Sequence, residues 1–204
     1  MKSFIHHEYV SIGHHNSTHR IILLHGWGAD SDDLLPIGKS IIHNLSHEFE
    51  IVSLKAPDFR ANGMGRQWYS LFPPDWNEAK ISVGKLIDTL KWFDTQKIPL
   101  RDTVLLGFSQ GAAMALDAGL RLDLGLVVSC SGYPHPEWIP SENCPVLLSH
   151  GLQDDIVPPS ASREILKKLK HKKYLNVGSH EFNCAHTIHE NFIDVIRIKI
   201  EEIF

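Results

Sequence analysis

Short runs of apolar residues recur along the chain, and polar or glycine-rich residues follow each of them. Within the runs the apolar character is continuous rather than alternating, which is typical of strands buried on both faces of a parallel sheet. An additional antiparallel strand over 4–13 is expected to turn at 14–18 and lead into the first of these runs. The runs predict strands at residues 20–25, 49–54, 102–108, 124–129, 144–150 and 172–177.

Helix-like segments lie between the predicted strands, and in the last of them the apolar residues recur at helical spacing. Pro158 and Pro159 are expected just before the fourth helix, where a missing N–H group costs little. Strands that alternate with helices predict an α/β fold, with a mostly parallel central sheet flanked by helices. The chain shows no internal repeat or low-complexity linker, so residues 1–204 are expected to form a single domain. The predicted helices span about residues 30–45, 77–95, 110–120, 160–170 and 189–202.

One connection is much longer than the others. Residues 55–76 show no periodicity, whereas strand-to-helix loops commonly have about two to six residues. Loops of this length in compact domains are usually functional or disordered. The aromatic residues Trp68, Tyr69 and Phe72 favour an ordered wall over a disordered tether.

Charge and cysteine content narrow the class of protein. The formal net charge of the 204 residues is −4, which gives no basic footprint for nucleic acid. Three cysteines, an odd and sparse set, indicate a reducing compartment rather than a disulfide framework. The first residues lack the apolar core of a signal peptide, and no apolar stretch approaches the roughly 18 residues that cross a bilayer. A cytoplasmic protein without stable membrane insertion is therefore expected.

A serine stands between two glycines where the strand at 102–108 gives way to a helix. The sequence there is Gly107-Phe108-Ser109-Gln110-Gly111. Gly-x-Ser-x-Gly at such a junction is the nucleophile elbow, a sharp turn that lifts the serine hydroxyl above the sheet edge. The start of a helix also favours developing negative charge. A serine N-cap with neighbouring glycines would give a similar pattern without any chemistry, so the interpretation depends on partners elsewhere.

A serine nucleophile needs a base, and the base needs an acid that orients it. In the hydrolase arrangement these follow in the order Ser, Asp or Glu, then His, each just beyond a later strand. The chain offers two candidate acids after the strand at 144–150 and three candidate bases around the last strand. They are Asp154, Asp155, His180, His186 and His189.

His186 is the favoured base because it falls in the loop between the last strand and the terminal helix, where an imidazole can reach over the sheet edge. His180 is expected in or beside the strand, and His189 in the first turn of the helix. Asp154 is preferred as the acid, because Asp155 is expected to cap backbone N–H groups in the turn that follows.

Acyl transfer also needs two donors directed at the developing oxyanion. The backbone N–H of Gln110, directly after the serine, is one candidate. The backbone N–H of Trp27 is the other, because Gly26 and Gly28 let the loop after the strand at 20–25 turn inward. A phosphate-binding loop is not favoured there, since the G-x-G-x-x-G pattern is incomplete.

At these motifs the chain resembles the phospholipase/carboxylesterase family of α/β-hydrolases, which includes the acyl-protein thioesterases. The matching segments are LLHGWGAD, APDFRANGMGRQWYSL, GFSQGAAMAL, SHGLQDDIVPP and HEFNCAHTIHENF, in the family's order. The resemblance implies an α/β-hydrolase fold, a Ser109–Asp154–His186 triad, and an oxyanion hole formed by the backbone amides of Trp27 and Gln110. It implies a carboxylesterase, lysophospholipase or acyl-protein thioesterase activity that proceeds through an acyl-enzyme, without metal or cofactor.

The substrate is expected in an open groove. Only residues 131–143 separate two predicted strands, which is too short for a cap domain. The apolar wall suits an acyl chain, each buried methylene being worth roughly 0.8 kcal/mol. Trp27 replaces the leucine that is usual in the family, and Ala185 replaces a glycine ahead of the histidine. The wall is expected from Trp27, Trp68, Leu71, Tyr133 and Trp138.

Three hypotheses for function follow: a serine hydrolase of esters or thioesters, a peptidase or lactone hydrolase on the same scaffold, and a non-catalytic binding protein with the hydrolase fold. The expected partner is a small-molecule or lipid acyl ester rather than nucleic acid, and a homodimer is compatible with the sequence. No metal site is predicted from the amino-terminal histidines, because adjacent residues of a strand point to opposite faces. Those histidines are His6, His7, His14, His15 and His19.

Overall fold

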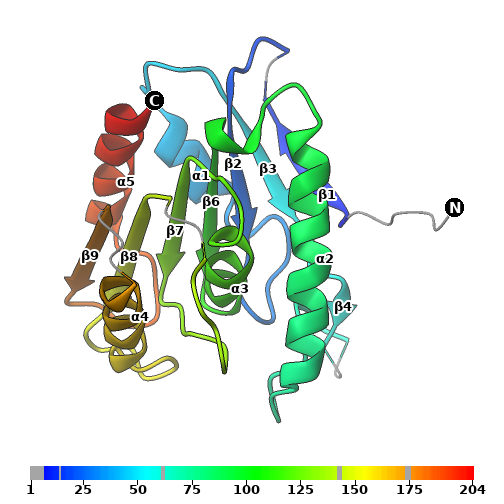
Figure 1. The fold of residues 1–204 in the computed structure, drawn as a ribbon, viewed down its shortest axis with the longest axis vertical. Helices are drawn as coiled ribbons and strands as arrows, with labels where there is room; N and C mark the ends of the chain where they lie inside the picture. Colours follow the sequence, from blue (N-terminus) through cyan, green and yellow to red (C-terminus); the bar gives the residue numbers. More distant parts are fainter. Residues whose placement is uncertain (1–6, 14, 61–62, 142–143, 173–175) are drawn as a thin grey trace, which may run out of the picture.

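The computed structural model describes residues 7–13, 15–60, 63–141, 144–172 and 176–204. Within these residues seven strands form one sheet: β1 (Tyr9–Ile12), β2 (His19–Leu24), β3 (Phe49–Leu54), β6 (Thr103–Phe108), β7 (Leu126–Cys130), β8 (Val146–Gly151) and β9 (Val177–Phe182). Their order in the sheet is β1-β3-β2-β6-β7-β8-β9. Only β1 runs antiparallel to its neighbour, and the other strands point toward one edge (Figure 1). The predicted, mostly parallel sheet is confirmed.

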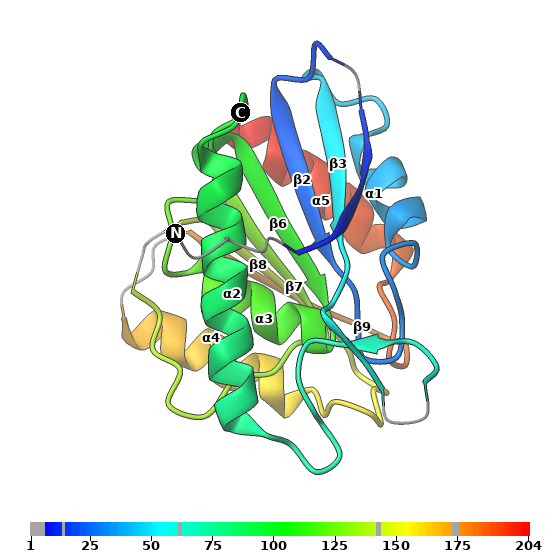
Figure 2. The same cartoon turned by 90° about the vertical axis from the view of Figure 1, so that its right-hand side faces the viewer.

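Helices cover both faces of this sheet. They are α1 (Leu35–Ile42), α2 (Trp76–Asp94), α3 (Gln110–Gly119), α4 (Ser160–His171) and α5 (Glu190–Ile203), with a short 3-10 helix, η1 (Leu100–Asp102). Figures 1 and 2 show α2, α3 and α4 on one face and α1 and α5 on the other. Helix α4 begins directly after Pro159, as the sequence predicts.

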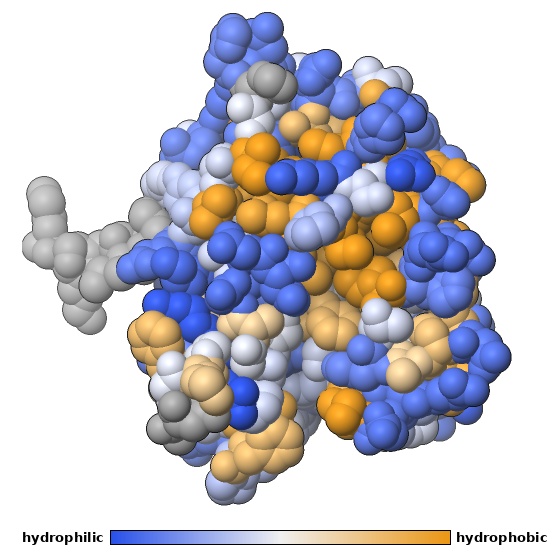
Figure 3. Space-filling view, turned by 180° about the vertical axis from the view of Figure 1, so that it is seen from behind, coloured by the Kyte–Doolittle hydropathy of each residue, from blue (hydrophilic) through white to orange (hydrophobic). Residues whose placement is uncertain are grey.

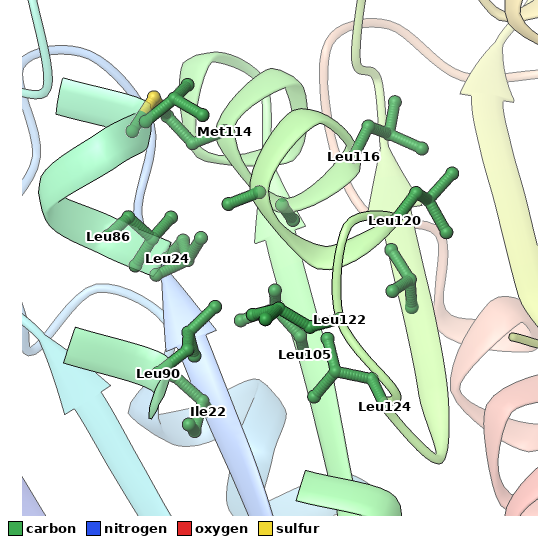
Figure 4. Close-up of a cluster of buried hydrophobic side chains, with 14 of the residues drawn as sticks. Ile22, Leu24, Leu86, Leu90, Leu105, Met114, Leu116, Leu120, Leu122 and Leu124 are labelled. Atoms are coloured by element: carbon green, nitrogen blue, oxygen red, sulfur yellow. The ribbon is translucent and has the colours of Figure 1, made fainter. Parts of the chain in front are cut away.

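Alternate residues of the central strands pack into two separate cores, because successive side chains point to opposite faces of a sheet. In β2, Ile22 and Leu24 pack on the side of α2 and α3, whereas Ile21 and Leu23 pack on the side of α1 and α5. Figure 4 shows the first of these cores, in which Leu90 of α2 lies beside the β2 side chains. Burial on both faces explains why the strand sequences are continuously apolar.

Among the described residues, no helix has both the length and the apolar character to cross a bilayer. Figure 3 shows the face covered by α1 and α5, where apolar and hydrophilic residues are interspersed.

The prediction for the amino-terminal strand is wrong in its pairing. Strand β1 pairs with β3, with Tyr9 opposite Leu54, and does not form a hairpin with β2. Both edges of β2 are already occupied, by β3 and β6, so β1 pairs instead with the outer edge of β3. Residues 4–6 and 14 of this prediction lie outside the described residues.

The last strand is displaced from its predicted position. It spans Val177–Phe182 instead of 172–177, of which 173–175 lie outside the described residues. Strand β9 forms the edge of the sheet next to β8, and its residues are half-buried or exposed. A strand at an exposed edge carries polar residues such as Ser179 and Glu181, so a search for continuous apolar runs misplaces it.

The long connection after β3 is largely ordered. Two short strands, β4 (Asp58–Phe59) and β5 (Arg66–Gln67), pair with each other and form a separate antiparallel ribbon. Residues 61–62 lie outside the described residues. The Asp75 carboxylate then accepts hydrogen bonds from the backbone amides of Asn77 and Glu78 and starts α2. In the described part of the connection between β7 and β8, residues 131–141 and 144–145, the chain forms an irregular loop without a cap.

Candidate active site

Ser109 connects β6 to α3 in a strained conformation. Its φ is 54° and its ψ is −117°, a backbone geometry that costs a non-glycine residue on the order of 1–3 kcal/mol. The flanking glycines allow the surrounding chain to close around this turn. A Cβ atom on Gly107 would collide with the carbonyl of Gly111, and one on Gly111 would collide with the carbonyl of Leu24. The Gly-x-Ser-x-Gly pattern is therefore a packing requirement of the turn.

The structure brings His186 and Asp154 into direct contact. The Nδ1 atom of His186 lies 2.7 Å from Oδ2 of Asp154, whose side chain is completely buried. Burial alone would raise the pKa of Asp154, but hydrogen bonds from His186 and from the Val157 amide outweigh it and lower that pKa. A carboxylate can only accept, so Nδ1 of His186 carries the proton and Nε2 is left as a basic atom.

Backbone contacts hold the loops of Asp154 and His186 together. The amide of Gln153 donates to the Cys184 carbonyl at 3.0 Å, and the amide of Leu152 donates to the Phe182 carbonyl at 2.7 Å. A Cβ atom on Gly151 would collide with the Cys184 carbonyl, so the end of β8 needs a glycine to approach this loop. The two side chains thus meet because the chain segments beneath them are in contact.

Asp154 also performs the capping expected of its neighbour. Its Oδ1 atom accepts hydrogen bonds from the amides of Ile156 at 3.0 Å and Val157 at 2.8 Å. Asp155 is exposed, so the expectation that it caps this turn is wrong. The physical reason is the direction of the two side chains: the buried carboxylate of Asp154 faces the backbone amides of the turn, whereas the side chain of Asp155 faces solvent. A fully buried histidine, His150, also places Nε2 3.3 Å from Oδ2 of Asp154.

Ser109 and His186 line the same groove. The ring of His186 lies 4.8 Å, centroid to centroid, from the ring of Phe108, the residue that precedes the serine. His180 lies within β9, as expected, whereas His189 is the N-cap of α5 through Nδ1 and directly precedes the first turn in which it was expected. Of the three candidate histidines, His186 is the one that reaches Asp154.

The loop after β2 approaches the serine closely. A Cβ atom on Gly26 would lie 3.5 Å from the Cβ of Ser109. The indole of Trp27, next in the chain, is held by the Arg60 guanidinium 3.6 Å from its centroid and by a hydrogen bond of 3.1 Å to Gln67. The Gln110 amide begins α3, where it has no carbonyl of its own helix to bind. Both backbone amides remain the predicted oxyanion donors.

The groove has a volume of about 1150 Å³ and a mostly apolar lining. Trp27, Leu71 and Tyr133 line it, as predicted. Phe72 and Ile156 also line the groove, and both are strongly exposed. Phe72 belongs to the aromatic residues expected to form an ordered wall, whereas the sequence analysis missed Ile156, which nothing in the pattern distinguished.

Trp68 and Trp138 do not belong to the described lining of the groove, contrary to expectation. Both are buried in the core on the side of α2 and α3. The Trp68 indole donates to the His25 carbonyl at 2.8 Å, and the backbone carbonyl of Trp68 accepts from the Ser82 hydroxyl at 2.6 Å. A large ring whose polar atom finds a buried acceptor gains more by packing than by facing solvent, so Trp68 supports the loop from beneath.

The side chain of Gln110 is an anchor that the sequence analysis did not anticipate. It is fully buried, its Oε1 accepts from the Trp68 amide at 3.0 Å, and its Nε2 donates to the Tyr69 carbonyl at 2.8 Å. His25 plays a similar part: Nδ1 lies 2.8 Å from the Gly26 carbonyl, and Nε2 accepts from the Ala56 amide. Burial lowers the pKa of His25, so this imidazole is neutral. The only feature of the sequence that could have indicated these two anchors, Gln110 and His25, is that each is a polar residue beside an apolar segment.

Two of the amino-terminal histidines, His7 and His19, have hydrogen-bonding contacts with threonine hydroxyl groups. His7 contacts the Thr89 hydroxyl at 2.8 Å, and His19 contacts the Thr18 hydroxyl at 2.9 Å. His6 and His14 lie outside the described residues. Throughout the described part of the chain, no three His, Cys, Asp or Glu residues are grouped so that they could hold a metal ion.

A family comparison agrees with this geometry. The model of the phospholipase/carboxylesterase family matches residues 5–203. The chain belongs to this family. Among its relatives, acyl-protein thioesterase 1 of Debaryomyces hansenii is 30% identical over 152 residues, which cover 62% of this chain and 66% of that protein. Esterase YpfH of Escherichia coli K12 is 27% identical over 146 residues, covering 67% and 62%. The matches span about half to two thirds of the lengths of the curated relatives.

Solved structures show the same fold. Esterase PE8 is 27% identical, with a TM-score of 0.84 over 98% of this chain and 99% of that one. The Bacillus cereus carboxylesterase superposes with a TM-score of 0.80 at 22% identity, over 97% of this chain and 95% of that one. The predicted α/β-hydrolase fold is confirmed.

Proposed function

We propose that this member of the phospholipase/carboxylesterase family is a serine hydrolase that cleaves carboxylic esters or thioesters. The observation that carries the proposal is the contact between His186 and buried Asp154 at a groove that Ser109 also lines. Esterases and thioesterases among the family's named members support the same class of reaction.

In the acylation step, Oγ of Ser109 attacks the carbonyl carbon of the substrate and gives its proton to Nε2 of His186. The backbone amides of Trp27 and Gln110 donate to the oxyanion of the tetrahedral intermediate. His186 then passes the proton to the leaving alkoxide or thiolate as the bond to the carbonyl carbon breaks. Asp154 accepts from Nδ1 throughout and stabilises the imidazolium.

In the deacylation step, a water molecule gives a proton to Nε2 of His186 and attacks the carbonyl carbon of the acyl-enzyme. Collapse of the second tetrahedral intermediate releases the carboxylic acid, and His186 returns the proton to Oγ of Ser109. Each step is a nucleophilic addition, an elimination or a proton transfer, and none changes an oxidation state, so the proposed reaction needs no redox partner.

The apolar lining of the groove supports an acyl chain as the bound portion of the substrate, whether from a small-molecule or a lipid ester. A cytoplasmic location and a homodimer remain expectations that accompany this proposal.

The proposal is tested by hydrolysis of p-nitrophenyl esters with short, medium and long acyl chains, alongside acyl-CoA thioesters and aminoacyl amides. Ser109→Ala should lower turnover by at least about a thousandfold, because the triad acts as a unit, and should abolish labelling by a fluorophosphonate probe. Ser11→Ala, on the remote strand β1, is the matched control. Labelling of the Ser109→Ala protein, or a strong preference for the amides, would contradict the proposal.

A further inference from the structure

A chain of hydrogen bonds runs from α3 to the groove through four side chains. Asp117 Oδ2 lies 2.9 Å from His135 Nδ1, and His135 Nε2 lies 2.9 Å from the Tyr69 hydroxyl. The Tyr69 hydroxyl is in turn 2.6 Å from the Tyr133 hydroxyl. Asp117, His135 and Tyr69 are buried, whereas Tyr133 is half-buried and lines the groove. The proposed catalytic steps use none of these four side chains.

The carboxylate of Asp117 determines which ring nitrogen of His135 carries the proton. Burial opposes ionisation of Asp117, but hydrogen bonds from His135 and Arg121 outweigh it and lower the pKa of its carboxyl. The Arg121 guanidinium already balances the carboxylate, at 2.6 Å from Oδ1. A carboxylate can only accept, so the single proton of the neutral His135 imidazole lies on the Nδ1 atom that faces Oδ2 of Asp117.

This arrangement gives every hydrogen bond in the chain one direction. With its proton on Nδ1, His135 can only accept at Nε2, so the Tyr69 hydroxyl donates to it. Tyr69 must then accept from Tyr133, whose single proton is used for that bond. Burial raises the pKa of Tyr133 to about 12 and that of Tyr69 further, so both phenols keep their protons. The Tyr133 oxygen is left with free lone pairs and no proton to offer the groove.

We propose that Tyr133 is a specificity-determining residue that presents a hydrogen-bond acceptor to the substrate, and that Asp117 sets this polarity through His135 and Tyr69. The preferred ester or thioester would then carry an O–H or N–H donor in the part of the molecule that lies beside Tyr133. The inference rests on the proposed hydrolase function, since it names a feature of the substrate for that site.

The first test compares matched substrates that differ only in donor capacity. Butyrate and hexanoate p-nitrophenyl esters are prepared with a hydroxyl or a methoxy group at successive carbons, and hydroxyethyl and methoxyethyl butyrates extend the series to the alcohol side. At one position the wild type should prefer hydroxyl over methoxy by about 2- to 12-fold in kcat/KM, the worth of one hydrogen bond. Tyr133→Phe should abolish that preference, whereas Tyr9→Phe, on β1, should preserve it.

The second test reverses the polarity. In Asp117→Asn, the Arg121 guanidinium requires an oxygen at the position of Oδ1, so the amide nitrogen occupies that of Oδ2. That N–H donates to His135 Nδ1, and the imidazole proton moves to Nε2. Nε2 then donates to the Tyr69 hydroxyl, and the Tyr69 hydroxyl donates to the Tyr133 hydroxyl. Tyr133 then donates into the groove, and the ratio of hydroxyl to methoxy substrates should fall below that of the wild type. Asp94→Asn, remote from the chain, is the control.

Two readouts separate this inference from the hydrolase proposal. Turnover of unsubstituted butyrate tests the hydrolase proposal alone. The ¹⁵N chemical shifts of His135 test the polarity alone, with Nδ1–H expected in the wild type and Nε2–H in Asp117→Asn. A wild-type His135 protonated on Nε2 would overturn the inference. So would a ratio of hydroxyl to methoxy substrates that Tyr133→Phe leaves within about twofold at every position; this comparison decides even if Asp117→Asn fails to fold.

Discussion

The Gln110 side chain offers a sharp test of how the residue after the serine organises the long loop. The proposed change is Gln110→Met, which keeps the length and approximate volume of the side chain but removes both of its polar groups. In the structure these groups satisfy the Trp68 amide and the Tyr69 carbonyl, and the residues involved are fully buried. Substitution leaves one backbone donor and one backbone acceptor without a partner.

The expected loss of stability follows from those two groups. Each buried polar group left unsatisfied costs about 1–3 kcal/mol, so the free energy of unfolding should fall by about 2–6 kcal/mol. Whole domains are stable by only about 5–15 kcal/mol, so this is a large effect. Leu71 and Phe72, which line the groove, follow directly after the anchored segment, and kcat/KM should fall as well.

Urea unfolding followed by far-UV circular dichroism measures the change, and hydrogen exchange of the Trp68 amide reports the local loosening. Gln96→Met is the matched control: Gln96 is exposed and bonds only to its neighbours in the α2 terminus, so its effect should stay within about 0.5 kcal/mol. A Gln110→Met protein as stable as this control, with an equally protected Trp68 amide, would refute the reasoning.

Asp154→Asn should lower kcat by several powers of ten, because the imidazole of His186 loses its orientation; in the best-studied triad the loss is about 10⁴-fold. Asp155→Asn should leave kcat nearly unchanged. Steady-state kinetics measure both variants, and the opposite ranking would show that the choice of acid is wrong. In acid, the lowered pKa values of Asp154 and Asp117 mean that both carboxylates stabilise the fold above the unfolded value of about 3.9. That contribution is lost as the pH falls through the folded pKa values. Urea unfolding across acidic pH should therefore show a flatter pH dependence for Asp154→Asn than for the wild type, and an equal or steeper one would contradict this sign.

The buried centre of the sheet was the most predictable part of the fold. Strands such as β2 and β6 are covered on both faces, so their sequences are continuously apolar and their positions were predicted within a residue or two. The edge strands of the sheet were less predictable, because they are not covered on all sides and need not be continuously apolar. Strand β9 carries polar residues on its open side, and the partner of β1 depends on which strand edge is unoccupied, which no local pattern encodes.

The site shows a similar division. The Gly-x-Ser-x-Gly turn and the order of acid and base follow from local chemistry, so the residues that meet could be proposed from the chain alone. The orientation of large side chains could not. Trp68 and Trp27 are both tryptophans in loops near the serine, yet the first is buried over an available carbonyl and the second faces the groove. The Asp117–His135–Tyr69–Tyr133 chain joins four segments that no spacing rule connects.

The two oxygens of Asp154 tie the base and the groove wall to a single side chain. One oxygen holds the imidazole of His186, and the other holds the backbone of Ile156 and Val157. In a redesign for other acyl groups, the exposed side chain of Ile156 can therefore be exchanged as long as its main-chain amide is kept, whereas the side chain of Val157 is buried and has to be replaced by one of similar size. Proline at either position would remove an N–H group that holds Asp154, and it would therefore change the catalytic rate rather than the choice of acyl group.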